Sequence, residues 1–168
     1  MAPIQIFIHG GAWRSGTAAQ YAFPAEVFVR AGAHFVVPDF DWVQDHDGDL
    51  RAMVDQVRRA VAWVARHAGK FGGDPDSIYL SGHSSGAHLA GVALTTDWDR
   101  DFGLPSNIVT GALLCSGMYD LRPVRLSARS SYVTITDEIE DELSALRHME
   151  AIVAPLIVAS FRDTGNIR

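Results

Sequence analysis

The chain has 168 residues, enough for one domain with a buried core, and its 48% hydrophobic and 20% charged residues are ordinary for a globular protein. Its net charge of −6 and pI near 5.5 argue against nucleic-acid binding, because no cluster of Lys and Arg is available to neutralise phosphates. No apolar run has membrane-spanning length, no signal peptide is apparent, and the one cysteine, Cys115, cannot form an intrachain disulfide, which together favour a cytoplasmic protein without a membrane partner.

Strands and helices are predicted to alternate along the chain. In chain order we expect a strand over 4–8, a helix over 18–31, a strand over 34–37, a loop over 38–48, a helix over 50–68, a strand over 77–81, a helix over 85–95, a strand over 108–116, short helices and loop over 122–148, and a strand over 154–160. The helix over 50–68 is the clearest, because its apolar residues recur every three or four positions and Asp47 or Asp49 can cap its start.

Apolar strands that alternate with helices predict an α/β fold, a three-layer α/β/α sandwich whose mainly parallel sheet is covered on both faces. No linker divides the sequence, so we expect a single domain over 1–168. The polar segment 122–148 is interpreted either as a lid over the site or as a solvated connector.

The central chemical motif is Gly82-His83-Ser84-Ser85-Gly86, a G-x-S-x-G pattern between a predicted strand and a predicted helix. A sharp turn in this context holds the serine in a strained conformation with its hydroxyl exposed, and flanking glycines allow the chain to pass closely. Ser84 is therefore the candidate nucleophile. The competing interpretation is a tight glycine turn whose serine has no chemical role.

A second motif, His9-Gly10-Gly11-Ala12-Trp13, directly follows the first strand. Acyl transfer requires N–H groups that face the developing oxyanion, and we expect them from Gly11, Ala12 and Ser85. His9 is interpreted as a residue that braces the loop rather than as the catalytic base. The alternative is an ordinary Gly-Gly turn that closes the strand.

These motifs, with the Phe71–Pro75 and Gly117–Pro123 stretches, make the chain resemble the α/β-hydrolase superfamily over nearly its whole length, from residue 4 to about 160. Within it the chain is similar to the branch of carboxylesterases and arylformamidases of the kynurenine formamidase kind. The resemblance implies an incomplete α/β-hydrolase fold, a serine nucleophile, an acidic residue after a late strand and a histidine near the C-terminus.

The sequence departs from that pattern at the acid and the base. None of its seven histidines follows the last predicted strand, so we expect no catalytic histidine in the chain. The resemblance places the acid in the loop after residues 155–159, where Asp163 is the candidate. Asp120 ends the preceding strand and is interpreted as a turn cap. The chain thus looks truncated at both ends, and we expect weak or no activity from it alone, because a serine hydroxyl without a base is a poor nucleophile.

Two functions remain open at this stage. The first is a serine esterase or amidase that cleaves a small carboxylic ester or an aryl or formyl amide through a Ser84 acyl-enzyme. The second is a hydrolase-fold binding module without catalysis, or an inactive fragment of the enzyme. We expect a small-molecule substrate, no nucleic-acid partner, no metal and no cofactor, and a homo-oligomer is left open.

Overall fold

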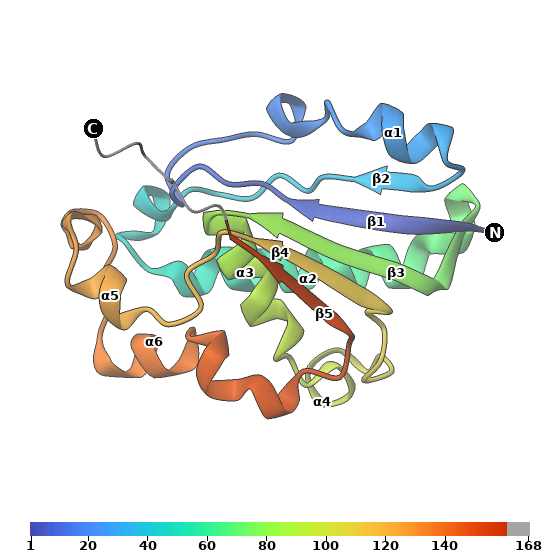
Figure 1. Ribbon diagram of the computed structural model, residues 1–168. Coiled ribbons are helices and arrows are strands. Elements are labelled where there is room, and N and C mark those ends of the chain that lie inside the picture. Colours follow the sequence, from blue (N-terminus) through green and yellow to red (C-terminus); the bar gives the residue numbers. More distant parts are fainter. Residues whose placement is uncertain (161–168) are drawn as a thin grey trace, which may run out of the picture.

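The computed structural model describes residues 1–160 (Figure 1). One sheet contains β1 (Ala2–Ile8), β2 (His34–Val36), β3 (Gly73–His83), β4 (Gly111–Cys115) and β5 (Leu156–Ala159). The sheet order is β2-β1-β3-β4-β5, and every pairing is parallel. The helices are α1 (Ala25–Arg30), α2 (Leu50–His67), α3 (Ser85–Leu94), α4 (Trp98–Phe102), α5 (Arg122–Arg125) and α6 (Asp137–Glu142), with 3-10 turns over 19–21, 43–46, 68–71, 128–131 and 145–151.

Helices lie on both faces of the sheet, as predicted (Figure 1). Helices α2 and α3 cover one face, while α1 lies on the other face, where Phe28 stacks on Phe35 of β2 at 4.9 Å between ring centroids. Helix α1 covers only part of this second face of the sheet. Leu113 of β4 and Ile157 of β5, which are register partners, remain 42% and 67% exposed. The three-layer α/β/α prediction is confirmed, with one layer incomplete over residues 1–160.

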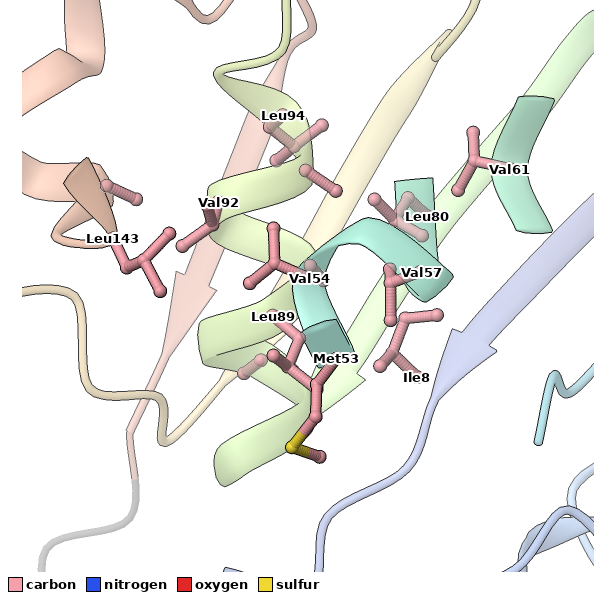
Figure 2. Packing of buried hydrophobic residues seen from close by; sticks show 14 of the residues in the cluster. Ile8, Met53, Val54, Val57, Val61, Leu80, Leu89, Val92, Leu94 and Leu143 are labelled. Atoms are coloured by element: carbon pink, nitrogen blue, oxygen red, sulfur yellow. The ribbon is translucent and has the colours of Figure 1, made fainter. Parts of the chain in front are cut away.

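The buried core lies between the sheet and the pair α2 and α3 (Figure 2). The predicted apolar stripe of α2 faces inward, and Val54 and Val57 lie beside Ile8 and Leu80 of the sheet. Burying each such side chain stabilises the fold by about 1.5–3 kcal/mol. Of the two candidate caps, Asp49 is the one that begins α2, since its carboxylate accepts a hydrogen bond from the Arg51 N–H at 2.8 Å.

The predicted set of helices needs two corrections. The helix over 18–31 is only α1 preceded by a 3-10 turn, because Pro24 has no N–H and disfavours helical backbone at the residue before it. Helix α4 was not predicted, although the sequence carries both of its end signals. Asp97 accepts a hydrogen bond from the Arg100 N–H, and Gly103 ends the helix at φ +60°.

Other boundaries shift by a few residues. Strand β3 is longer than the predicted 77–81, β4 is shorter than 108–116, and the predicted loop 38–48 contains a 3-10 turn at 43–46. The segment 122–148 does form short helices, as predicted. Within residues 1–160, no helix is both long and apolar enough to span a membrane.

Candidate active site

Ser84 occupies the sharp turn between β3 and α3, at the edge where the parallel strands end. Its backbone lies at φ 55° and ψ −123°, a region that costs a non-glycine residue about 1–3 kcal/mol. The Ser84 N–H donates to the Cys115 carbonyl at the end of β4 at 2.8 Å, which fixes the turn to the neighbouring strand. The Ser84 side chain makes no cap bond to α3. The predicted strand–turn–helix is therefore present, with the hydroxyl not used to cap the helix.

The glycines around Ser84 are required by close backbone contacts. A Cβ on Gly82 would lie 2.5 Å from the Gly86 carbonyl oxygen, and one on Gly86 would lie 2.1 Å from the carbonyl oxygen of Ile8. Both separations are far below van der Waals contact. A Cβ on Gly10 would lie 3.3 Å from Ser84 Cβ, so the loop after β1 runs directly beside the serine. The structure thus brings together the two motifs, which are about 75 positions apart in sequence.

The loop after β1 has an unusual backbone. Gly11, Ala12 and Trp13 have φ values of +127°, +55° and +63° in succession, and the Arg14 N–H closes the turn onto the Gly11 carbonyl at 3.1 Å. Positive φ at Ala12 and Trp13 is unfavourable, so surrounding contacts must hold this turn in place. The N–H groups of Ala12 and Ser85 lie in the two backbone segments next to Ser84. Ser85 is the first residue of α3, and the first N–H groups of a helix have no partner within the helix.

The side chain of Trp13 anchors that strained turn. It is 1% exposed, and its indole N–H donates to His88 Nδ1 at 3.2 Å. His88 Nε2 donates in turn to the Leu143 carbonyl at 2.9 Å, so the neutral imidazole is fully bonded. Complete burial lowers the pKa of His88 to about 4, only partly opposed by the bond to Leu143. Sequence reasoning assigned no such role to His88, although its position four residues after Ser84 places it on the first turn of α3.

His9 lies at the start of the same loop. Its ring lies between Phe40, at 4.3 Å, and Tyr21, at 5.2 Å between centroids, and its Nδ1 donates to the Gly10 carbonyl at 2.8 Å. The ring is 1% exposed, and within residues 1–160 its Nε2 has no hydrogen-bond partner.

No histidine is bonded to Ser84 in the part of the chain that the structure describes. His46 pairs with Asp41, while His67 and His148 bond to the carbonyls of Trp63 and Asp141. These contacts involve the ring nitrogens of His46, His67 and His148 in bonds away from Ser84.

The two candidate acids have different outcomes. Asp163 lies outside the described residues. Asp120 caps a turn, as we expected: its carboxylate accepts hydrogen bonds from the Arg122 N–H and the Arg147 guanidinium, both at 3.0 Å. The bond from the Arg122 backbone, with Arg147 beside it, holds the pKa of Asp120 below its usual value. Asp120 is thus occupied structurally rather than directed at an imidazole.

The segment 122–148 lies beyond the carboxyl ends of the strands and beside the loop after β1 (Figure 1). Its Tyr132 ring lies 4.4 Å from the guanidinium carbon of Arg14, and the Thr134 N–H donates to the Gly48 carbonyl at 2.9 Å. Glu140, with a side chain only 12% exposed, bonds to Arg147 at 2.7 Å and to Arg125 at 3.3 Å. The ion pairs hold the short helices of this segment together over one side of the site.

Cys115 and the arrangement of possible metal-ligating side chains complete the description of the site. Cys115 is a free, half-buried thiol. Over residues 1–160, no group of three or more His, Cys, Asp or Glu side chains is arranged to hold a metal ion.

The family model BD-FAE matches residues 1–111. The chain belongs to this family, and it is an α/β-hydrolase of the carboxylesterase and arylformamidase type. Kynurenine formamidase of Salmo salar is 34% identical over 158 residues, 94% of this chain and 49% of that protein. Esterase LipC of Mycobacterium tuberculosis is 30% identical over 173 residues, covering 99% of this chain and 40% of that protein. The chain thus spans about half the length of the curated relatives it matches.

Solved esterase structures share the fold. Esterase 2 of Thermogutta terrifontis phosphoramylated by tabun superposes with a TM-score of 0.72 at 20% identity, over 95% of this chain and 71% of that one. Inhibited esterase B of Lactobacillus rhamnosis gives a TM-score of 0.76 at 20% identity, over 94% of this chain and 55% of that one. At this identity the likeness establishes the α/β-hydrolase fold and leaves the chemistry to the site itself.

Proposed function

We propose that this chain carries the nucleophile and the oxyanion-binding groups of a serine hydrolase that cleaves a small carboxylic ester or an aryl or formyl amide. Ser84 is the nucleophile, and the N–H groups of Gly11, Ala12 and Ser85 bind the oxyanion. The observation that carries the proposal is the strained Ser84 backbone, at φ 55° and ψ −123°, directly beside the positive-φ loop that follows β1.

The chemistry follows from the position of these groups. The Ser84 hydroxyl adds to the substrate carbonyl carbon, its proton passes to a base, and the carbonyl oxygen becomes an oxyanion. Backbone N–H groups and the N-terminus of α3 favour that negative charge. Collapse of the tetrahedral intermediate expels the alcohol or amine, which takes up a proton, and leaves an acyl-serine that water hydrolyses.

The base of the mechanism is assigned to none of residues 1–160, where no histidine is hydrogen-bonded to Ser84. A triad without one member retains only the acceleration that the oxyanion groups and substrate binding supply. We therefore expect slow acylation of Ser84 by activated reagents, and slow turnover, from the chain alone. Small esters and amides fit the relatives, which are named as esterases and kynurenine formamidases.

The test is covalent trapping followed by intact mass and peptide mapping. The 168-residue chain is incubated with excess fluorophosphonate, and Ser84→Ala and Ser106→Ala are treated in parallel; Ser106 is an exposed serine in the loop before β4. We expect one adduct on Ser84 in the original chain and in Ser106→Ala, and none in Ser84→Ala.

Equal labelling of all three proteins would reject Ser84 as the nucleophile. Absence of labelling in every protein, with the fold intact by circular dichroism, would instead favour the binding module. That second function is motivated by His46 and His88, whose rings bond to groups other than Ser84, and it predicts ligand binding without any acyl-serine.

A further inference from the structure

His88 is the residue at which three segments around the proposed site meet. It lies one turn into α3, where its backbone N–H donates to the Ser84 carbonyl at 3.2 Å. Its ring accepts a hydrogen bond from the Trp13 indole N–H in the loop after β1, and it donates to the Leu143 carbonyl just after α6. One residue therefore joins the nucleophile turn, the loop after β1 and the segment 122–148.

Every member of this chain of hydrogen bonds is buried. Trp13 is 1% exposed, and His88 and Leu143 are 0% exposed, so water cannot replace a bond that is lost. The indole and imidazole rings meet edge to face, with 5.4 Å between their centroids. Since burial lowers the pKa of His88 to about 4, the ring is neutral near pH 7, and its Nδ1 has the lone pair that the indole N–H requires. These contacts fix the direction of the indole side chain.

The Leu143 carbonyl is held in place by the residue that follows it. Ser144 is 0% exposed, and its hydroxyl accepts a hydrogen bond from the Leu121 N–H at 2.9 Å and donates to the Glu140 carbonyl. These bonds seat the end of α6 on the chain that follows β4. The position of the Leu143 carbonyl, and with it the imidazole, therefore depends on how this segment is seated.

Trp13 transmits that position to the loop after β1. Its backbone, at φ +63°, follows Ala12 at φ +55°, and two such conformations in succession are unfavourable. The Trp13 carbonyl accepts a hydrogen bond from the Val43 N–H at 2.8 Å, so Trp13 is held at its backbone as well as at its side chain. A shift of Trp13 would move Ala12 too, because a planar peptide bond joins them.

From these contacts we propose that His88 is a positioning residue, which relays the seating of the segment 122–148 to the N–H groups that bind the oxyanion. The Leu143 carbonyl orients the imidazole, the imidazole holds the indole of Trp13, and Trp13 fixes the Ala12 N–H beside Ser84. Loss of either hydrogen bond lets the strained loop move away from the oxyanion. This role rests on the proposed function, since it acts on the same oxyanion-binding groups.

The first measurement is the kinetics of Ser84 labelling in the full 168-residue chain. The fluorophosphonate concentration is varied, which gives the maximal rate constant and the half-saturating concentration separately. His88→Leu, a side chain of similar size without nitrogen, should lower the maximal rate constant about tenfold to a hundredfold and leave the half-saturating concentration unchanged, because oxyanion groups act on the transition state. His88→Asn should recover part of the rate, because its amide oxygen can accept the bond from Trp13.

Matched variants separate positioning from stability. Val61→Ala removes a buried side chain of α2 and none of these hydrogen bonds, so its maximal rate constant should stay within about twofold of the original. Ser144→Ala loosens the Leu143 carbonyl from a distance and should lower the rate about threefold. Its control is Ser130→Ala, whose exposed hydroxyl donates to the Ser127 carbonyl at 2.8 Å and whose rate should not change. Rates are compared at a temperature where thermal melting shows every variant to be folded.

The second measurement follows the link without any chemistry at Ser84. The chain has four tryptophans, and Trp13→Phe identifies the indole N–H signal of Trp13 in the nitrogen-15 NMR spectrum. We expect this N–H to exchange slowly with deuterated water in the original chain and about tenfold faster in His88→Leu and Ser144→Ala. In Ser130→Ala the exchange should remain slow.

The positioning role would be overturned by a maximal labelling rate constant in His88→Leu equal to the original one. It would also be overturned by an equal loss of rate in Val61→Ala, or by indole exchange that is unchanged in His88→Leu and Ser144→Ala. If no protein is labelled, the hydrolase proposal fails, and the exchange rates alone decide whether the segment 122–148 is linked to the loop after β1. Labelling of Ser84 that is insensitive to His88 and Ser144 rejects the relay and leaves the hydrolase proposal standing.

Discussion

The two faces of the sheet differ in how completely helices cover them. On the face of α2 and α3, Leu114 of β4 is 2% exposed, while the next residue, Leu113, points to the α1 face and is 42% exposed. An open strip of Tyr79, Leu113 and Ile157 continues across β3, β4 and β5 on that second face, each of them at least 40% exposed. Apolar side chains of similar size therefore experience very different surroundings one position apart.

The difference follows the site. The more fully covered face contains α3, whose first turn approaches β1 closely enough to fix Ser84, and His88, which anchors Trp13. At β5 this face is open too, since Val158, the register partner of Leu114, is 56% exposed. The α1 face is open near β5, and the resemblance places the acid in the loop after that strand. Close packing positions Ser84 and the loop after β1, the proposed site residues that this chain supplies. Substitutions should therefore lower the free energy of unfolding strongly on the α2 and α3 face and weakly on the α1 face.

The largest effect is expected from Gly86→Ala. Its Cβ would meet the carbonyl oxygens of Ile8 and His9 at 2.1 Å and 2.3 Å, so α3 must move away from β1. We expect the free energy of unfolding to fall by about 3–4 kcal/mol, measured by urea denaturation. Gly69→Ala is the control, since a Cβ there meets nothing within 4 Å. A loss below about 1 kcal/mol in Gly86→Ala would show that the elbow is not tightly packed.

The neighbouring leucines of β4 test the comparison most directly. Leu114→Ala should lower the free energy of unfolding by about 3 kcal/mol, because it leaves a cavity between the sheet and α3. Leu113→Ala should lower it by less than about 1 kcal/mol, because its side chain is already partly hydrated. Equal losses in the two variants, from the same denaturation measurement, would mean that both faces are covered in solution.

Much of the fold could be predicted from sequence because the signals are local. Each signal involves residues close together in the sequence: the three-and-four spacing of α2, the apolar runs of the strands and the glycines around Ser84. The helix over 18–31 failed because a single proline outweighed the apolar pattern. The contacts of Trp13 with His88, and of Arg14 with Tyr132, join residues 75 and 118 positions apart; no local pattern carries such information. The role of Asp163 stays a prediction.

His88 makes the packed face sensitive to pH. Its pKa is about 4 in the folded protein and about 6.5 when unfolded, so the unfolded chain binds the proton first as pH falls. The stability contributed by the neutral imidazole is fully present above pH 6.5 and is lost as the pH falls toward 4. Between pH 7 and pH 5 we expect a loss of about 2 kcal/mol from this group.

The measurement is the free energy of unfolding at pH 7, 6 and 5 in the original chain and in His88→Gln. The slope with pH should be shallower in His88→Gln, whatever its stability at pH 7, because no imidazole titrates at that position. His67→Gln, which also removes an imidazole and whose ring is stacked on Trp63, is the matched control. A slope unchanged in His88→Gln would mean that His88 is not buried as a neutral ring.

The smallest effect is expected on the open strip itself. Ile157→Lys should change the free energy of unfolding by no more than about 0.5 kcal/mol, since a side chain that is 67% exposed loses little packing and the lysine can reach water. Binding of the dye anilinonaphthalene sulfonate should fall at the same time, because the apolar strip is interrupted. A loss of unfolding free energy above about 1.5 kcal/mol would instead show that Ile157 is covered in solution. The difference in coverage between the two faces of the sheet would then not hold for the protein in solution.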